Sequence, residues 1–101
     1  MSLTIHIFYT GEGNNARAFA QEMVDSGLVD QIRSRPGNEG YAYYYPAEDA
    51  KTVLLIDRWQ DQAALDAHHK SPIMEQIAKL RQRYHLRMRV ERYVEEPKQT
   101  T

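Results

Sequence analysis

Four stretches of the chain place their side chains alternately on two faces, which is typical of β-strands. They are Leu3 to Tyr9, Tyr41 to Tyr45, Thr52 to Trp59 and Leu86 to Val94. β-branched and aromatic residues, which favour strands, are frequent in them. In the third stretch both sets of side chains contain large apolar residues. We therefore expect both faces of the sheet to be covered.

Between these stretches, apolar residues recur every three or four positions, which predicts helices. The first runs from about 15 to 34, is weakened at Ser26-Gly27, and ends at Arg35-Pro36-Gly37 because proline and glycine favour a turn there. Asp61 is the expected N-cap of a second helix. Ser71-Pro72 restarts it, with Ser71 as N-cap and Pro72 at the first helical position.

The element order is therefore β-α-β-β-α-β, with the second helix split. This order predicts an α+β fold of the ferredoxin-like type, a four-stranded antiparallel sheet with helices on one face. Those helices leave the other face bare, and a second copy of the sheet is the simplest cover, so we expect a homodimer. The predicted domain spans residues 1–94. Residues 95–101 contain no apolar side chain and are expected to form a flexible tail.

Composition narrows the classes of function. The chain has 101 residues, 13 basic and 14 acidic side chains, and no cysteine. The near-neutral charge argues against nucleic-acid binding, and the lack of cysteine excludes disulfides and thiolate chemistry and suits the cytoplasm. No apolar run is long enough to span a membrane. We expect a small cytoplasmic domain whose chemistry depends on histidine, tryptophan and phenols.

One motif is more specific than composition. It consists of an acidic residue two positions before a strand-terminal tryptophan, an acidic helix cap, Ala-Leu, a histidine nine positions after the tryptophan, and Ser-Pro. The matching residues are Asp57, Trp59, Asp61, Ala64-Leu65, His68 and Ser71-Pro72. With Arg35-Pro36-Gly37 and Gly40-Tyr41, this pattern resembles the antibiotic biosynthesis monooxygenase family over about residues 3 to 94.

The resemblance implies a dimeric α+β barrel in which two ferredoxin-like sheets pack face to face. It also implies oxidation of a small quinol-like or polyphenolic substrate by O2 without metal or flavin. A deprotonated phenol in a shielded pocket can pass one electron to O2. The protein must supply a proton acceptor, hydrogen-bond donors for the phenolate oxygen, and a site that excludes water.

His68 and Trp59 are the candidate catalytic residues. The imidazole of His68 titrates near neutrality, which suits acid–base work on a phenol, and the Trp59 indole N–H can donate to a substrate oxygen. Each also has a structural reading. We favour this structural interpretation for both: Trp59 as a large core residue at a helix–sheet junction, and His68 as a histidine that fixes the corner between Trp59 and the restarted helix.

Five further residues are candidates for substrate binding: Tyr43, Tyr84, Leu55, Asp57 and His6. Tyr43 is chosen because it is central in its strand, whereas Tyr41, Tyr44 and Tyr45 are attributed mainly to strand propensity and dimer packing. Tyr84 would lie near the pocket mouth or in the core. His6 lines the pocket or lies at the dimer interface, and we favour the interface.

Two departures from the family pattern leave the substrate open. In the anthrone-oxidising branch an asparagine four positions before the tryptophan helps to hold the substrate, and here that residue is Leu55. In the haem-degrading branch the first strand carries an asparagine and the last helix a histidine. This chain has neither, so we expect no haem.

Two other classes of function stay open. An isomerase or lyase on the same barrel could use the same histidine as a proton shuttle, and it would turn over without O2. A non-catalytic dimeric binding or stress protein would use Trp59 and His68 only for packing. A filled core beside Trp59 would favour that class.

Overall fold

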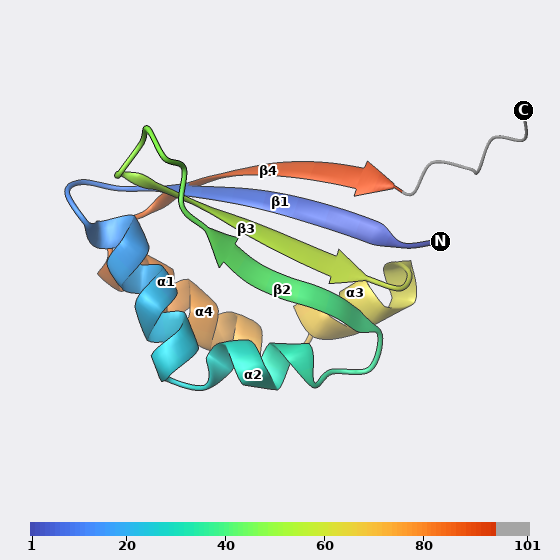
Figure 1. The fold of residues 1–101 in the computed structure, drawn as a ribbon. Coiled ribbons are helices and arrows are strands. Elements are labelled where there is room, and N and C mark those ends of the chain that lie inside the picture. Colours follow the sequence, from blue (N-terminus) through green and yellow to red (C-terminus); the bar gives the residue numbers. More distant parts are fainter. Residues whose placement is uncertain (95–101) are drawn as a thin grey trace, which may run out of the picture.

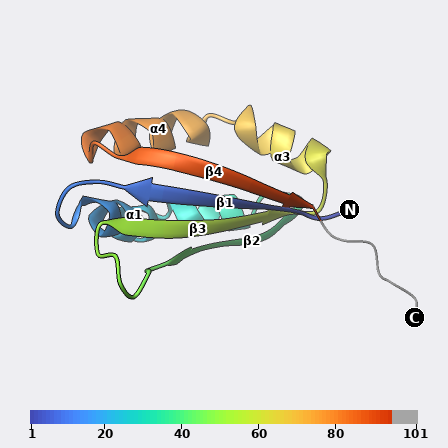
Figure 2. The same cartoon turned by 90° about the horizontal axis from the view of Figure 1, so that it is seen from above.

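The computed structural model describes residues 1–94, and over this range a four-stranded antiparallel sheet carries all its helices on one face (Figure 1). The strands are β1 (Leu3–Thr10), β2 (Asn38–Tyr44), β3 (Thr52–Trp59) and β4 (Arg87–Val94). The helices are α1 (Asn15–Asp25), α2 (Leu28–Arg33), α3 (Gln62–His69) and α4 (Ile73–Arg83). The strand order β2-β3-β1-β4 (Figure 2) confirms the predicted ferredoxin-like fold.

The predicted first helix is two helices. Gly27 separates α1 from α2 and has a φ of +86°, a left-handed conformation that glycine adopts without a Cβ clash. The N–H of Gly27 bonds to the Val24 carbonyl, and its own carbonyl accepts from the N–H of Gln31. The chain therefore changes direction at the Ser26-Gly27 weak point, and the prediction of one continuous helix was wrong.

The second helical region is split as predicted, with one different cap. The Asp61 side chain accepts a hydrogen bond of 2.9 Å from the backbone N–H of Ala64, which confirms Asp61 as the N-cap of α3. Ser71 was predicted to cap α4, but Pro72 occupies the cap position and α4 begins at Ile73. The Ser71 hydroxyl instead donates to the carbonyl of His68 at 2.8 Å and ties the end of α3 to the connection.

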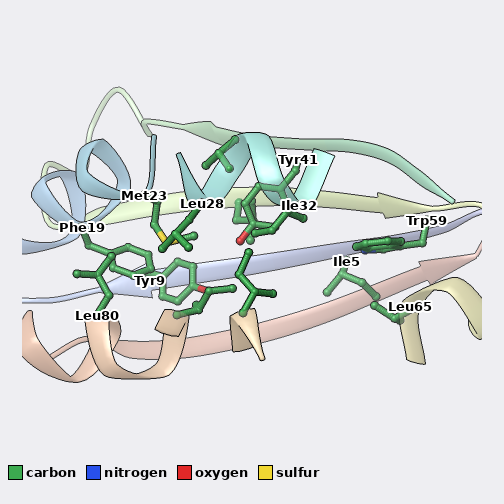
Figure 3. Close-up of a cluster of buried hydrophobic side chains, with 14 of the residues drawn as sticks. Ile5, Tyr9, Phe19, Met23, Leu28, Ile32, Tyr41, Trp59, Leu65 and Leu80 are labelled. Atoms are coloured by element: carbon green, nitrogen blue, oxygen red, sulfur yellow. The ribbon is translucent and has the colours of Figure 1, made fainter. Parts of the chain in front are cut away.

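The core lies between the sheet and the helices. Phe19 and Met23 of α1, Ile32 of α2 and Leu80 of α4 pack against the sheet face that carries Ile5 and other alternate residues of β1, β2 and β3 (Figure 3). This face holds the first set of side chains in each predicted alternation. Period-two patterning therefore sorted the side chains of the three strands into two faces correctly, and the structure shows which of the two faces lies beneath the helices.

The other face of the sheet is open in the single chain. Its apolar residues Phe8, Leu54 and Ile56 are partly buried by their neighbours, and over residues 1–94 no helix packs on them. The edge strand β4 is also poorly covered, with Val90 52% and Val94 60% exposed. One chain thus does not meet the expectation that both faces are covered, and the homodimer stays a prediction. The predicted flexible tail, residues 95–101, lies outside the described residues.

Candidate functional site

The strand register brings polar side chains together beneath the helices. Asp57 of β3 lies directly opposite Tyr41 of β2, and Trp59 follows on the same face two residues later. Tyr9 of β1 and Tyr43 of β2 face the same side. We call these five residues the buried polar cluster. Figure 3 shows Tyr9, Tyr41 and Trp59 on this side of the sheet among apolar core residues.

Asp57 is the acidic member of the buried polar cluster and is only 4% exposed. Its Oδ1 accepts a hydrogen bond of 2.7 Å from the Trp59 indole N–H. Burial disfavours the charged carboxylate and raises the pKa of Asp57 to about 7, while the Trp59 hydrogen bond opposes that rise. Asp57 can therefore release or accept a proton near neutral pH, as a general acid or base must.

The three tyrosines of the buried polar cluster are hydrogen-bond donors at neutral pH. Burial raises the pKa of Tyr9 to about 12 and raises the pKa values of Tyr41 and Tyr43 further above their ordinary range. The rings of Tyr41 and Tyr43 meet edge-on, with centroids 5.9 Å apart. The hydroxyl of Tyr43 is buried near that of Tyr41 but makes no hydrogen bond of normal geometry.

His68 lies beside the buried polar cluster, on α3. Its ring stacks on Trp59 with centroids 4.8 Å apart and planes 23° apart, and it is 2% exposed. Burial, and secondarily the positive charges of His69 and Arg35, lower the pKa of His68 to about 4. The imidazole is neutral at pH 7, and its buried Nδ1 has no hydrogen-bond partner. Trp59 thus has a carboxylate on its indole nitrogen and an imidazole on its ring face.

The other predicted site residues are dispersed. Leu55 is buried on the helix-covered face of the sheet, where it lies opposite Tyr43 on one neighbouring strand and Ile7 on the other. Tyr84 ends α4, where its hydroxyl donates to Glu22 at 2.6 Å, away from Asp57. His6 lies on the open face and contacts the ring of Tyr93 at 4.7 Å. The open face is where we expect the partner sheet to pack, so His6 lies where its predicted interface role requires. That role stays a prediction.

The structure adds Tyr9 and Tyr41 to the candidate residues. Tyr41 was attributed to strand propensity and dimer packing, but it is 3% exposed and lies beneath the helices, beside Asp57. Tyr9 is 2% exposed. The sequence signal that could have identified them is the alternation of side chains between the two faces of a strand. Tyr9 lies on the same face as Leu3 and Ile5, and Tyr41 lies on the same face as Tyr43.

Three hollows on the surface lie away from Trp59. One of about 430 Å³ lies between α1 and β2, one of about 300 Å³ lies among α1, α2 and α4, and one of about 480 Å³ lies on the open face near Phe8 and Arg87. Neither Trp59 nor His68 lines any of the three. Tyr43 is the member of the buried polar cluster that also lines a hollow, the one between α1 and β2.

Within residues 1–94, no three histidine, aspartate or glutamate side chains gather as metal ligands would. In the same range, every helix is too short or too polar to cross a membrane.

Comparison with solved structures supports the fold. SnoaB, a cofactor-independent oxygenase from Streptomyces nogalater, superposes with a TM-score of 0.77 at 13% identity, over 96% of this chain and 95% of its own. A provisionally assigned antibiotic biosynthesis monooxygenase from Deinococcus radiodurans gives 0.82 at 14% identity, over 98% and 97%. PA3566 from Pseudomonas aeruginosa gives 0.76 at 22% identity, over 94% of each chain.

A search of curated proteins by sequence finds no match. The family of antibiotic biosynthesis monooxygenases, in contrast, matches residues 2–80, which include β1 to β3 and most of α4. This range holds Asp57, Trp59 and His68, the residues on which the resemblance rested. The match covers well over half of the 101 residues, and the chain therefore belongs to the antibiotic biosynthesis monooxygenase family.

Proposed function

We propose that this protein is a cofactor-independent monooxygenase that oxidises a small quinol-like or polyphenolic substrate with O2. Family membership supports the reaction class. The observation that carries the proposal is Asp57, a buried carboxyl group with a pKa of about 7 that is held by Trp59 and lies opposite Tyr41 in the sheet. Such a group can accept the proton of a phenol at neutral pH.

In the proposed reaction, the substrate O–H gives its proton to the Asp57 carboxylate. The phenolate passes one electron to O2, and the phenoxyl radical and superoxide combine to form a C–O bond. Loss of water leaves the oxidised product, so one oxygen atom enters the product and the other leaves in water. Both hydrogens of that water come from the substrate, one from the phenol and one from the oxidised carbon.

The neighbouring side chains have distinct roles in this proposal. The Trp59 indole N–H fixes the orientation of the Asp57 carboxyl through the 2.7 Å hydrogen bond. The tyrosine hydroxyls, which stay protonated, donate to the phenolate oxygen and stabilise its charge. His68 positions Trp59 by stacking, since a pKa of about 4 leaves it neutral at pH 7 and makes it a weaker proton acceptor than Asp57.

The proposal includes a homodimer formed through the open face of the sheet. The partly buried Phe8, Leu54 and Ile56 form an apolar strip there, and Arg89 lies over the Phe8 ring at 4.1 Å. A second sheet packed on this strip would remove it from water. Because Asp57 points to the opposite face, each subunit keeps its own buried polar cluster.

Replacement of Asp57 tests the proposed function. Asp57→Asn keeps an oxygen acceptor for the Trp59 N–H but cannot take a proton, so O2 consumption with a quinol should fall about 100-fold or more. The matched control is Asp61→Asn, which retains a good helix cap and lies outside the buried polar cluster. An oxygen electrode with a panel of hydroquinones and anthrones measures both. Equal rates for Asp57→Asn and the wild type would refute the assignment of Asp57 as the base.

One observation favours a second candidate, the non-catalytic binding protein. Trp59 and His68 are 0% and 2% exposed and pack against each other, so that corner is a filled core. This candidate predicts binding of a phenol without consumption of O2 by any member of the panel. Turnover of the same substrate under anaerobic conditions would instead indicate an isomerase or lyase.

A further inference from the structure

The hollow between α1 and the edge strand β2 is lined by aromatic side chains. Three consecutive tyrosines, Tyr43 to Tyr45, line it together with Val24 and Gln21 of α1. Tyr44, Tyr45 and Val24 are 52%, 47% and 50% exposed, so large apolar side chains face water here. We call this feature the tyrosine hollow. Its volume of about 430 Å³ suits a ligand of one or two aromatic rings.

Tyr43 connects the tyrosine hollow with the buried polar cluster. Its ring lines the hollow and meets Phe19 edge-on at 6.3 Å. Its hydroxyl is buried on the side of Tyr9, Tyr41 and Asp57, and it lacks a hydrogen bond of normal geometry. The neighbouring Tyr41 hydroxyl satisfies it only incompletely, and a ligand oxygen would complete the hydrogen bonding of this buried group.

The charge at the tyrosine hollow suits a phenol. Its lining contains the cation Arg33 and no carboxylate. The Arg33 Nε donates to the Tyr41 carbonyl at 2.9 Å, which fixes the guanidinium against β2. Arg17 lies over the Tyr45 ring at 4.6 Å and holds that side chain at the rim. Aromatic walls beside a fixed cation attract an electron-rich ring whose hydroxyl can ionise.

The hollow among α1, α2 and α4 is less suitable. Its lining mixes Glu22 with Lys79 and Arg83. Its apolar members Leu28 and Leu80 are buried core residues, 6% and 4% exposed, and no member of the buried polar cluster lines it.

We propose that the tyrosine hollow is the entrance for a small phenol, and that Tyr43 both opens the passage to the buried polar cluster and hydrogen-bonds to the phenol. Rotation of the Tyr43 side chain away from Phe19 would open a path from the hollow towards Tyr41, which lies opposite Asp57 in the sheet. The identity of the ligand class rests on the proposed function, whereas the route can be tested by binding alone.

The chain offers a clean test because it has one tryptophan, Trp59, and no cysteine. Binding of 4-nitrophenol, which absorbs where tryptophan emits, is followed by stopped-flow quenching of Trp59. Val24→Cys is measured before and after reaction with a bulky non-fluorescent maleimide. Gln76→Cys, an exposed position that lines two hollows elsewhere on the helical side, is the matched control. The label should slow association about tenfold at residue 24 and leave it unchanged at residue 76.

Tyr43→Phe tests the hydrogen bond. It keeps the ring and removes the hydroxyl, so 4-nitrophenol should bind about fivefold more weakly, with an unchanged melting temperature. Tyr93→Phe, on the open face and outside the tyrosine hollow, should bind the probe as the wild type does. Unchanged affinity in Tyr43→Phe would overturn the role of its hydroxyl.

The outcomes separate the route from the reaction. Slower binding only with the label at residue 24, without any O2 consumption, would support the entrance while the proposed oxygenase fails. O2 consumption that neither label slows would overturn the entrance and leave the oxygenase standing. Slower binding with the label at residue 76, or no quenching of Trp59 by the probe, would also overturn the entrance.

Discussion

Burial acts in opposite directions on the two titratable residues that contact Trp59. It raises the pKa of Asp57 from 3.8 to about 7 and lowers the pKa of His68 from 6.5 to about 4. The contribution of Asp57 to the free energy of unfolding is greatest below pH 3.8 and is lost as the pH rises towards 7. The contribution of His68 to the free energy of unfolding is greatest above pH 6.5 and is lost as the pH falls towards 4. In the wild type the two effects oppose each other between about pH 4 and pH 7.

The difference in stability between each variant and the wild type should report the pH-dependent effect of the group that was removed. In Asp57→Asn, the free energy of unfolding relative to the wild type should rise by as much as about 4 kcal/mol between about pH 4 and pH 8. In His68→Phe, it should rise by as much as about 3 kcal/mol as the pH falls from about 7 to 4. Urea denaturation across this range measures both. Differences that do not vary with pH would mean that neither group is perturbed in the folded state.

At the scale of elements, the turn at Gly37 places α3 against the start of β2. Gly37 has a φ of +85°, and a Cβ there would lie 2.5 Å from the Cβ of Ala64. Its carbonyl also accepts from the N–H of Gln60 at 2.8 Å, which ties the turn to the end of β3. Only glycine permits both the left-handed backbone and this close approach. The turn therefore helps to fix α3, and with it His68, over Trp59.

Gly27 provides a matched comparison for Gly37. Its φ is +86°, but a Cβ there would meet nothing within 4 Å. Gly27→Ala should therefore cost only the backbone term, about 1 kcal/mol, whereas Gly37→Ala should cost about 2–4 kcal/mol. Denaturant unfolding measures both variants. Equal losses would mean that the contact with Ala64 is relieved by a small shift of α3.

At the scale of the whole molecule, the open face of the sheet is the surface on which no helix packs over residues 1–94. Ile56→Lys places a charge on the apolar strip of this face, so the proposed dimer should dissociate to a monomer of about 11.8 kDa. Val24→Lys places the same charge on the helical side and should leave the dimer intact. Light scattering after size-exclusion chromatography determines both masses. A wild-type monomer, or an intact Ile56→Lys dimer, would contradict assembly through this face.

Local patterns predicted most of the fold because each depends on a few neighbouring residues. The alternation in Thr52–Trp59 and the cap at Asp61 were both confirmed. Predictions that depended on the path of the backbone were less accurate. Ser71 had the residue type of a cap, but its hydroxyl bonds back to His68, and Gly27 broke a helix that the apolar stripe continued.

The candidate site was only partly predictable. The spacing of Asp57, Trp59 and His68 was visible in the sequence, and the structure brings these three side chains into contact through Trp59. The proton acceptor was less visible, because a pKa depends on burial and partners rather than on residue type. His68 has the more suitable ordinary pKa, yet burial makes Asp57 the group that titrates near neutral pH.

The sequence by itself determined the order of the elements, the alternation of side chains along each strand and the family. These follow from periodicity, turn residues and a short motif, which are properties of the chain read in one dimension. Only the tertiary structure decided which side chains lie together. The register between β2 and β3 put Tyr41 beside Asp57, and packing of the helices excluded water from both. Electrostatics depends on distance and burial in three dimensions, so the raised pKa of Asp57 emerged only when the helices packed on the sheet.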